Sequence, residues 1–219
     1  SRPTLTVVSP FYNEVEAIAE FCLQLRSVLD AMDVEYEVVL VDDGSTDGSW
    51  EAATGPDWPQ RTVLRLASNA GHQAALDAGV RHSHGDFVVT MDSDLQHPPE
   101  VVAELLATIR AESVDVVYAV RSDRREEGRF KRWSAHWYYR VVRALTSVPI
   151  IEDAADFRIM SRFVVDVVNA IPDKKVFRLI LPSLGFSFST VAYKANSRYA
   201  GESKYSLRHM TRLAIRSSV

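Results

Sequence analysis

The first 120 residues alternate between short runs of consecutive apolar residues and longer stretches in which apolar residues recur every three or four positions. Short apolar runs are typical of buried strands, and the longer spacing is typical of amphipathic helices. The pattern predicts strands at residues 5–9, 37–41, 62–66, 87–91 and 115–120, and helices at about 13–29, after 48, at 71–82 and at 98–111. Such alternation indicates an α/β fold whose mainly parallel sheet carries helices on both faces.

Residue types at two predicted helix starts suggest how those helices begin. Asn13 is a common capping residue, and Glu16 stands three positions later, where a capping-box partner would be. Pro98 or Pro99 is expected to start the helix that runs to residue 111, because proline favours the first turn of a helix.

The pattern changes after residue 120. We expect a helix at 130–145, a strand at 157–160, a helix at 163–170, a half-exposed strand at 186–193 and a basic amphipathic helix at 203–216. Arg208, Arg212 and Arg216 fall four apart on the last helix, with apolar residues on its other side. This arrangement is typical of a helix that lies on an anionic membrane surface, although an amphipathic helix packed on the core has the same pattern.

Polar side chains follow the predicted strands of the first half. Ser9-Pro10, Asp42-Asp43, residues 66–69 and Asp92-Ser93-Asp94 all stand at strand ends. In open parallel sheets, ligands bind beyond the carboxyl ends of the strands. The sequence therefore predicts one ligand site along this edge.

Asp92 and Asp94 are the strongest candidates for chemistry. On an extended chain, carboxylates two residues apart lie on the same face and repel each other. A divalent cation would relieve that repulsion, and carboxylate oxygens together with the amide of Gln96 suit Mg²⁺ or Mn²⁺. Helix capping or an Asx turn is the alternative interpretation.

Asp42 and Asp43 allow two interpretations. One carboxylate could bind a nucleobase or ribose, as an acidic residue does at a strand end in dinucleotide folds, or both could belong to a plain turn. The sequence contains neither a G-x-G-x-x-G motif after the first strand nor a G-x-x-x-x-G-K-[ST] motif. Dinucleotide oxidoreductases and P-loop enzymes are therefore disfavoured.

Composition and charge narrow the class of protein. The chain has 219 residues, 47% of them hydrophobic, and one cysteine, so we expect a single domain without an internal disulfide. Residues 1–120 have a net charge of −14 and residues 121–219 a net charge of +10. This asymmetry predicts two different partners, and the acidic strand ends argue against nucleic acid. No apolar run reaches the roughly 18 residues of a membrane span.

Five motifs resemble family 2 glycosyltransferases of the GT-A fold: SPFYNE at 9–14, VDDGSTDG at 41–48, GHQAAL at 71–76, MDSDLQHPPE at 91–100 and ADFR at 155–158. Their order and spacing are similar to the polyprenyl-phosphate branch, which includes dolichyl-phosphate mannose synthase and undecaprenyl-phosphate glucosyltransferases. The resemblance covers nearly the whole chain. Ala155 departs from it, because the family usually has glycine before the aspartate.

The resemblance implies a role for each matching residue. It implies Asp156 as the catalytic base, although holding Arg158 or orienting the acceptor is a rival role. The other implied sets are a nucleotide pocket of Pro10, Tyr12, Glu14, Asp42, Asn69 and Gln73, a metal site of Asp92, Asp94 and Gln96, and an acceptor-phosphate site of Arg121, Arg198, Ser203 and Lys204.

The resemblance and the charge pattern together give an expected function. We expect an inverting, metal-dependent transfer of a hexose from a nucleotide sugar to a polyprenyl phosphate at the cytoplasmic face of the membrane. UDP-glucose is the favoured donor and GDP-mannose the second choice. The alternatives are transfer to a polysaccharide or protein glycan, a sugar nucleotidyltransferase and a non-enzymatic nucleotide-sugar sensor.

The same reasoning predicts how the chain is organised. Residues 1–120 are expected to form the half that binds nucleotide sugar and metal. Residues 121–219 are expected to form the half of the same domain that binds the acceptor and the membrane. A C-terminal membrane segment is expected beyond residue 219, and a homo-oligomer is possible.

Overall fold

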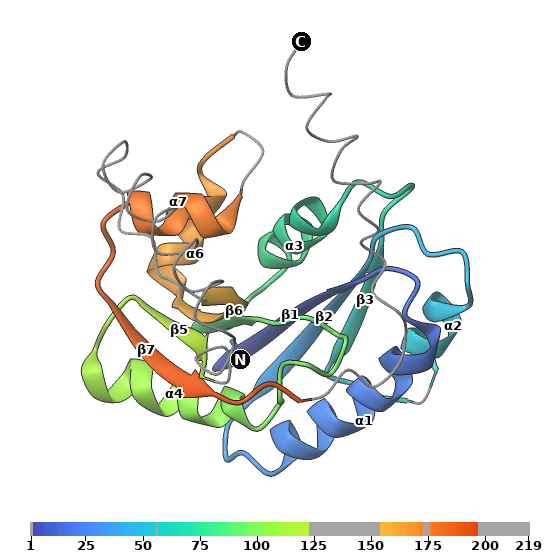
Figure 1. Cartoon of the computed structure of the whole chain (residues 1–219), viewed down its shortest axis with the longest axis horizontal. Helices are drawn as coiled ribbons and strands as arrows, with labels where there is room; N and C mark the ends of the chain where they lie inside the picture. The colour runs from blue at the N-terminus through green and yellow to red at the C-terminus, as the bar shows by residue number, and fades with distance from the viewer. Residues whose placement is uncertain (1, 56, 123–153, 173–175, 197–219) are drawn as a thin grey trace, which may run out of the picture.

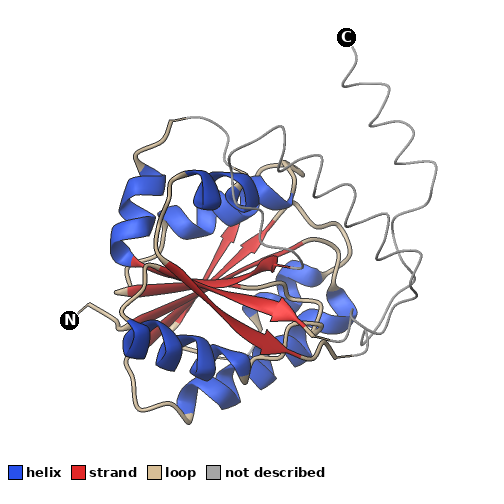
Figure 2. Ribbon diagram, turned by 60° about the vertical axis from the view of Figure 1, so that its left-hand side comes forward, coloured by secondary structure: helices blue, strands red, loops and turns tan. Residues whose placement is uncertain are grey.

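The computed structural model describes residues 2–55, 57–122, 154–172 and 176–196. Within them, one seven-stranded sheet has the strand order β3-β2-β1-β4-β6-β5-β7. The sheet lies between two layers of helices (Figures 1 and 2). The expected α/β fold with helices on both faces is therefore confirmed for this part of the chain.

Most elements fall within a few residues of the sequence-based prediction. The strands are β1 Leu5–Phe11, β2 Tyr36–Asp42, β3 Arg61–Arg65, β4 Phe87–Thr90, β5 Val116–Arg121, β6 Ala154–Ser161 and β7 Phe188–Tyr193. The helices are α1 Val15–Asp30, α2 Ser49–Thr54, α3 His72–Arg81, α4 Val101–Glu112, α6 Arg162–Asn169 and α7 Phe177–Ser183.

The sheet is mainly parallel, with one reversed strand. β1, β2, β3 and β4 run parallel to one another, and β7 runs parallel to β5. β6 is antiparallel to both β4 and β5. Because β6 is reversed, its first residues lie at the edge where the parallel strands end.

Each face of the sheet has its own apolar layer. α1 and α4 bury side chains such as Phe21 and Leu105 against one face, and α3, α6 and α7 bury Leu76, Val164 and Phe177 against the other (Figure 1). At Gly79 of α3, a Cβ atom would lie 2.4 Å from the side chain of Val8. This close approach fixes α3 on β1 and brings its first turn to the ligand edge of the sheet.

The predicted start of α1 is wrong. Asn13 has φ 51° and does not cap the helix; its Oδ1 accepts a hydrogen bond from the backbone N–H of Thr46, 2.9 Å away. The N–H of Glu14 instead donates to Ser49 Oγ, at 2.8 Å. The loop after β2 therefore satisfies the start of α1, so an interaction between distant segments replaces the local capping box.

Two further helix predictions need correction. α4 begins at Val101, after a turn in which Val101 N–H and Val102 N–H bond to the carbonyl groups of Pro98 and Pro99. α7 was not predicted. It has seven residues and contains Pro182, which disfavours a helical interpretation of the sequence.

Several sequence-based predictions fall on residues that the structure does not describe. These are the helices at 130–145 and 203–216, together with Arg198, Ser203, Lys204, Arg208, Arg212 and Arg216. Among the residues that are described, no helix is both long enough and apolar enough to cross a bilayer.

Candidate active site

Two aspartates meet where β4 and β6 pair. Thr90 of β4 lies opposite Arg158 of β6 in an antiparallel register, so continuing that register by two residues brings Asp92 opposite Asp156. Thr90 Oγ1 also donates a hydrogen bond to the carbonyl of Asp156, at 2.8 Å. Carboxylates 64 positions apart in the sequence thereby share one end of the sheet.

His72 lies between these carboxylates. It is the first residue of α3, and its Nε2 is 3.5 Å from Asp92 Oδ1 and 3.4 Å from Asp156 Oδ2. The hydrogen bond to Asp156 raises the pKa of His72 against the opposing effect of burial, and the charges of both aspartates raise it further. A protonated His72 thus offsets the repulsion between the two carboxylates.

Three more side chains surround Asp156. The buried guanidinium of Arg158 pairs with its Oδ1. Gln73 Nε2 donates to its Oδ2 at 3.0 Å, while Gln73 Oε1 accepts the N–H of Phe177 at 3.1 Å. Arg178 of α7, which is 61% exposed, reaches within 4.0 Å of Oδ2. Asp156 is therefore the centre of a cationic cluster that also holds the start of α7.

This environment determines the charge of Asp156. Burial alone would raise its pKa, but the hydrogen bond from His72 and the charge of Arg158 outweigh burial and hold the pKa well below its usual range. A carboxylate that binds protons this weakly is a poor general base. The geometry suits Asp156 to hold cations in place.

The loop that contains Asp92 and Asp94 is tightly bonded. Asp94 Oδ1 accepts the N–H of Gln96 at 3.1 Å, which forms an Asx turn, and Leu95 has φ 64°. Ser93 Oγ donates to the carbonyl of Pro10, 3.2 Å away. Asp94 therefore forms the Asx turn that was the alternative to a metal site, whereas Asp92 takes no part in that turn.

Asp92 keeps an oxygen atom for a further ligand. Among the described residues, its Oδ1 is a buried oxygen that accepts no hydrogen bond, and His72 is its ion-pair partner. No group of three or more His, Cys, Asp or Glu side chains in this part of the chain could enclose a metal by itself. The carboxylates of Asp92 and Asp94 nevertheless have the chemistry that suits Mg²⁺. Proteins commonly hold this ion through one or two carboxylates plus substrate phosphates.

Asp42 and Asp43 both bond to neighbouring loops. Asp42 is fully buried; its Oδ1 accepts the N–H of Ser45 at 2.8 Å, and its Oδ2 is 3.2 Å from Arg65 Nε. Asp43 accepts the N–H groups of residues 70 and 71, at 2.7 and 3.0 Å. In this conformation the two carboxylates fix the loops that lead into α2 and α3.

The remaining predicted nucleotide residues line the same edge. Pro10 is buried at the end of β1, Tyr12 is 39% exposed, Glu14 is half-buried and Asn69 is exposed in the loop after β3. Gly44 brings two of these loops together, since it has φ 74° and a Cβ atom there would lie 2.8 Å from the backbone of Ser68.

Sequence reasoning missed three residues at this edge of the sheet, and they differ in how far the sequence could have indicated their positions. His72 lies in the GHQAAL motif at a predicted helix start, so its position could have been inferred. Arg178 lies on the unpredicted α7. His97, which had no expected role, accepts the N–H of Asp92 through Nδ1, at 3.0 Å.

Arg121, which was expected to bind the acceptor phosphate, lies at the same edge of the sheet, opposite Tyr193.

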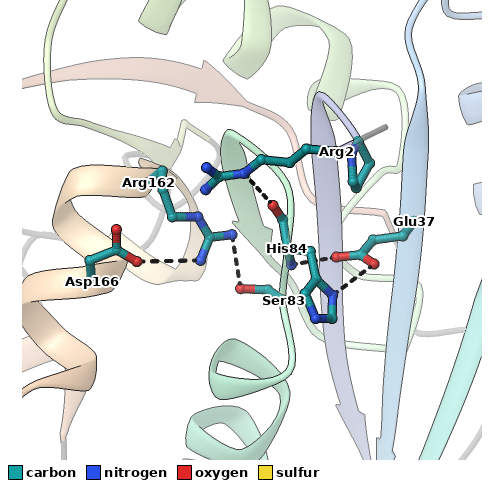
Figure 3. Close-up of a pocket in the computed structure, with 7 residues that line it drawn as sticks. Arg2, Glu37, Ser83, His84, Arg162 and Asp166 are labelled. Atoms are coloured by element: carbon teal, nitrogen blue, oxygen red, sulfur yellow. Dashed lines mark hydrogen bonds and ion pairs between the residues drawn. The ribbon is translucent and has the colours of Figure 1, made fainter.

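A pocket of about 590 Å³ lies at the opposite edge of the sheet (Figure 3). Its charged groups bond to one another or to nearby backbone. Glu37 binds His84, Arg2 donates to the carbonyl of His84, and Arg162 pairs with Asp166. Arg162 also donates to the carbonyl of Gly85, so the loop before β4 is held both from the start of the chain and from α6. We regard this pocket as a structural ion network.

Comparison with protein families gives one match, which covers most of the chain. Residues 6–168 match the family model described as glycosyl transferase family 2. Two curated relatives are each 36% identical over 96% of this chain: an uncharacterized glycosyltransferase of Bacillus subtilis and the bactoprenol glucosyl transferase of Shigella phage SfV. The chain spans 66% and 69% of their lengths, respectively, or about two thirds.

Solved structures with the same fold are more distant in sequence. A mannosyltransferase from Pyrobaculum calidifontis, in complex with GDP-Man and Mn²⁺, has a TM-score of 0.62 at 23% identity, over 92% of this chain and 59% of that one. Glucosyl-3-phosphoglycerate synthase from Mycobacterium tuberculosis, in complex with Mn²⁺, UDP-glucose and phosphoglyceric acid, has a TM-score of 0.69 at 18% identity, over 97% and 76%. These similarities support the GT-A fold.

Proposed function

Because the chain belongs to glycosyl transferase family 2, we propose that it transfers a hexose from a nucleoside diphosphate sugar to a polyprenyl phosphate at the cytoplasmic face of a membrane. The observation that carries the proposal is the approach of Asp92 and Asp156 to the same nitrogen of His72, at 3.5 and 3.4 Å. Arg178 stands beside Asp156. An acidic site suited to metal and diphosphate thus adjoins a cation suited to an anionic acceptor.

The proposed donor is UDP-glucose, with GDP-mannose as the second choice. The names of several relatives, which are bactoprenol glucosyl transferases, support both the glucosyl group and the polyprenyl acceptor. The nucleotide would lie over the ends of β1, β2 and β3, in contact with Pro10, Tyr12, Glu14, Asp42, Asn69 and Gln73. For Asp42 to touch the base, the Arg65 side chain would have to move, since it now covers that carboxylate.

Asp92 and Asp94 are the residues that would hold Mg²⁺ or Mn²⁺, with Gln96 beside them. A divalent cation there would neutralise the diphosphate and make it a better leaving group. His72 contacts both Asp92 and Asp156 and would order the Asp92 carboxylate before the donor arrives. The Asx turn at Asp94 serves the same purpose, because it fixes the loop.

The chemistry requires little proton transfer from the protein. A lipid phosphate is already anionic near neutral pH, so its oxygen can attack the anomeric carbon directly. The bond from that carbon to the nucleoside diphosphate breaks, and the configuration inverts. Asp156 would hold His72 and Arg178 where the two phosphate groups meet, a positioning role that contributes through orientation.

Arg178→Gln is expected to raise the KM for polyprenyl phosphate by about tenfold or more, since one charge-assisted contact contributes about 1.5–3 kcal/mol. The Kd of the donor should stay within about twofold. Steady-state kinetics with varied acceptor and calorimetry with UDP-glucose measure the two effects. Arg110→Gln, an exposed change on α4 at the other face of the sheet, is the matched control. A selective loss of donor affinity would instead assign Arg178 to the diphosphate.

A donor panel tests the first half of the proposal. A ligand that binds the folded state raises its melting temperature. UDP-glucose, GDP-mannose and other nucleotide sugars should be compared by thermal shift, each with and without Mn²⁺. The expected result is the largest shift with UDP-glucose in the presence of Mn²⁺. If no nucleotide sugar shifts the transition, the proposed donor site is wrong.

A further inference from the structure

His97 is a buried histidine at the end of the loop that contains Asp92 and Asp94. The residue is 5% exposed. Its ring stacks on Phe157, with centroids 4.9 Å apart and planes at 19°, and meets the edge of Tyr193 at 5.9 Å. Phe157 and Tyr193 also contact each other, at 5.5 Å. The ring is thus held by side chains from β6 and β7.

One specific hydrogen bond connects this ring to Asp92. The backbone N–H of Asp92 can only donate, so Nδ1 of His97, 3.0 Å away, must accept. In the neutral ring the proton is then on Nε2, which lies 3.8 Å from Asp92 Oδ2. The imidazole therefore faces Asp92 through both nitrogens, one toward the backbone and one toward the carboxylate.

The contacts of His97 join the loop to the rest of the site. Phe157, on which the ring stacks, follows Asp156 in β6. Gln96, the residue before His97, accepts through its carbonyl the N–H of Asn196, at 3.3 Å. The loop is consequently fixed against β6 and against the segment that follows β7. A shift of the His97 ring would move Asp92 relative to Asp156.

We propose that His97 is a positioning residue that sets the orientation of Asp92 for the metal and diphosphate. This inference rests on the proposed function, because Asp92 is assigned there as a metal ligand. His97 touches neither reacting group. It acts through the hydrogen bond to Asp92 N–H, and the aromatic stack supplies the rigidity. Groups that hold a metal ligand in place orient it, and changing such a group typically lowers the affinity for the metal.

Two substitutions separate the hydrogen bond from the stack. His97→Asn keeps an acceptor near the position of Nδ1 but loses the aromatic ring. His97→Phe keeps the ring but loses the acceptor. His84→Phe, at an exposed histidine on the opposite edge of the sheet, is the control for a histidine-to-phenylalanine change.

The measurement is the Kd of Mn²⁺ by calorimetry, in the presence of UDP and, separately, of GDP. His97→Phe is expected to weaken Mn²⁺ binding by about 10- to 100-fold, whereas His97→Asn stays within about threefold of the wild type. The melting temperature of each variant shows whether the fold persists. Equal weakening in both variants, or unchanged binding in His97→Phe, overturns the proposal.

This readout also separates the inference from the proposed function. Mn²⁺ and nucleotide binding can be measured whether or not any lipid-linked product forms. A wild-type protein that binds Mn²⁺ but glycosylates another acceptor would contradict the proposed function and leave the His97 proposal intact. A wild type that binds no Mn²⁺ with either nucleotide would overturn the His97 proposal.

Discussion

Asp92→Asn is expected to lower the rate of glycosyl transfer by about a hundredfold or more. The change removes one negative charge and keeps the shape of the side chain. Removing a single preorganised electrostatic contact from an active site typically costs 10²- to 10³-fold in turnover, on the order of 3–4 kcal/mol. The loss should appear in kcat and in the Mn²⁺ dependence, as measured by initial rates across a metal titration.

The same variant should keep its fold. Asp92 Oδ1 accepts no hydrogen bond from the described residues, and its ion-pair partner His72 keeps Asp156, so the amide leaves no protein donor unsatisfied there. Asp86→Asn is a suitable control, because Asp86 is exposed and pairs with Arg2 at the opposite edge of the sheet. Activity within about twofold of the wild type would show that Asp92 is not a metal ligand. Wild-type activity that persists in excess chelator would show that the reaction does not need a divalent metal.

Asp156→Asn is expected to affect both turnover and stability. Arg158 is 1% exposed, and Asp156 is its carboxylate partner. Breaking a buried ion pair costs about 3–5 kcal/mol, which corresponds to a fall of roughly 6–20 °C in Tm for a chain of this size. Turnover should fall by about a hundredfold, because His72 and Arg178 lose the group that positions them.

A second variant separates these two effects. Asp156→Asn combined with Arg158→Gln replaces the ion pair by two amides, so part of the lost stability should return. Turnover should stay low, since the cations at His72 and Arg178 still lack their carboxylate. Thermal denaturation and initial rates on both variants are the measurements. If turnover recovers together with Tm, Asp156 has only a structural role.

The parallel half of the fold could be predicted because its signals are local. Each strand from β1 to β5 contains a short apolar run, and each polar strand end lies at the edge where parallel strands end. The reversal of β6 could not be predicted in this way. An apolar run such as residues 157–160 reads the same in either direction, so only the pairing of β6 with β4 and β5 reveals that Asp156 meets Asp92.

Other parts of the site depend on contacts between distant segments. α7 is short and contains Pro182, so its sequence does not indicate a helix; Gln73 of α3 holds its first residue. The role of His97 depends on a left-handed Leu95, which folds the loop back so that His97 meets Asp92. Residue type and spacing indicated Asp92 and Asp94, and the family resemblance indicated Asp156, but the contacts of His97 and Arg178 required the folded chain.

The most direct test is to follow the transferred sugar. The protein is incubated with UDP-glucose labelled in the sugar, a polyprenyl phosphate and Mn²⁺, and the mixture is extracted with organic solvent. We expect the label to enter the organic phase in proportion to the enzyme, with release of UDP. Label that stays in the aqueous phase while UDP is released, or a reaction that releases pyrophosphate, would contradict transfer to a polyprenyl phosphate.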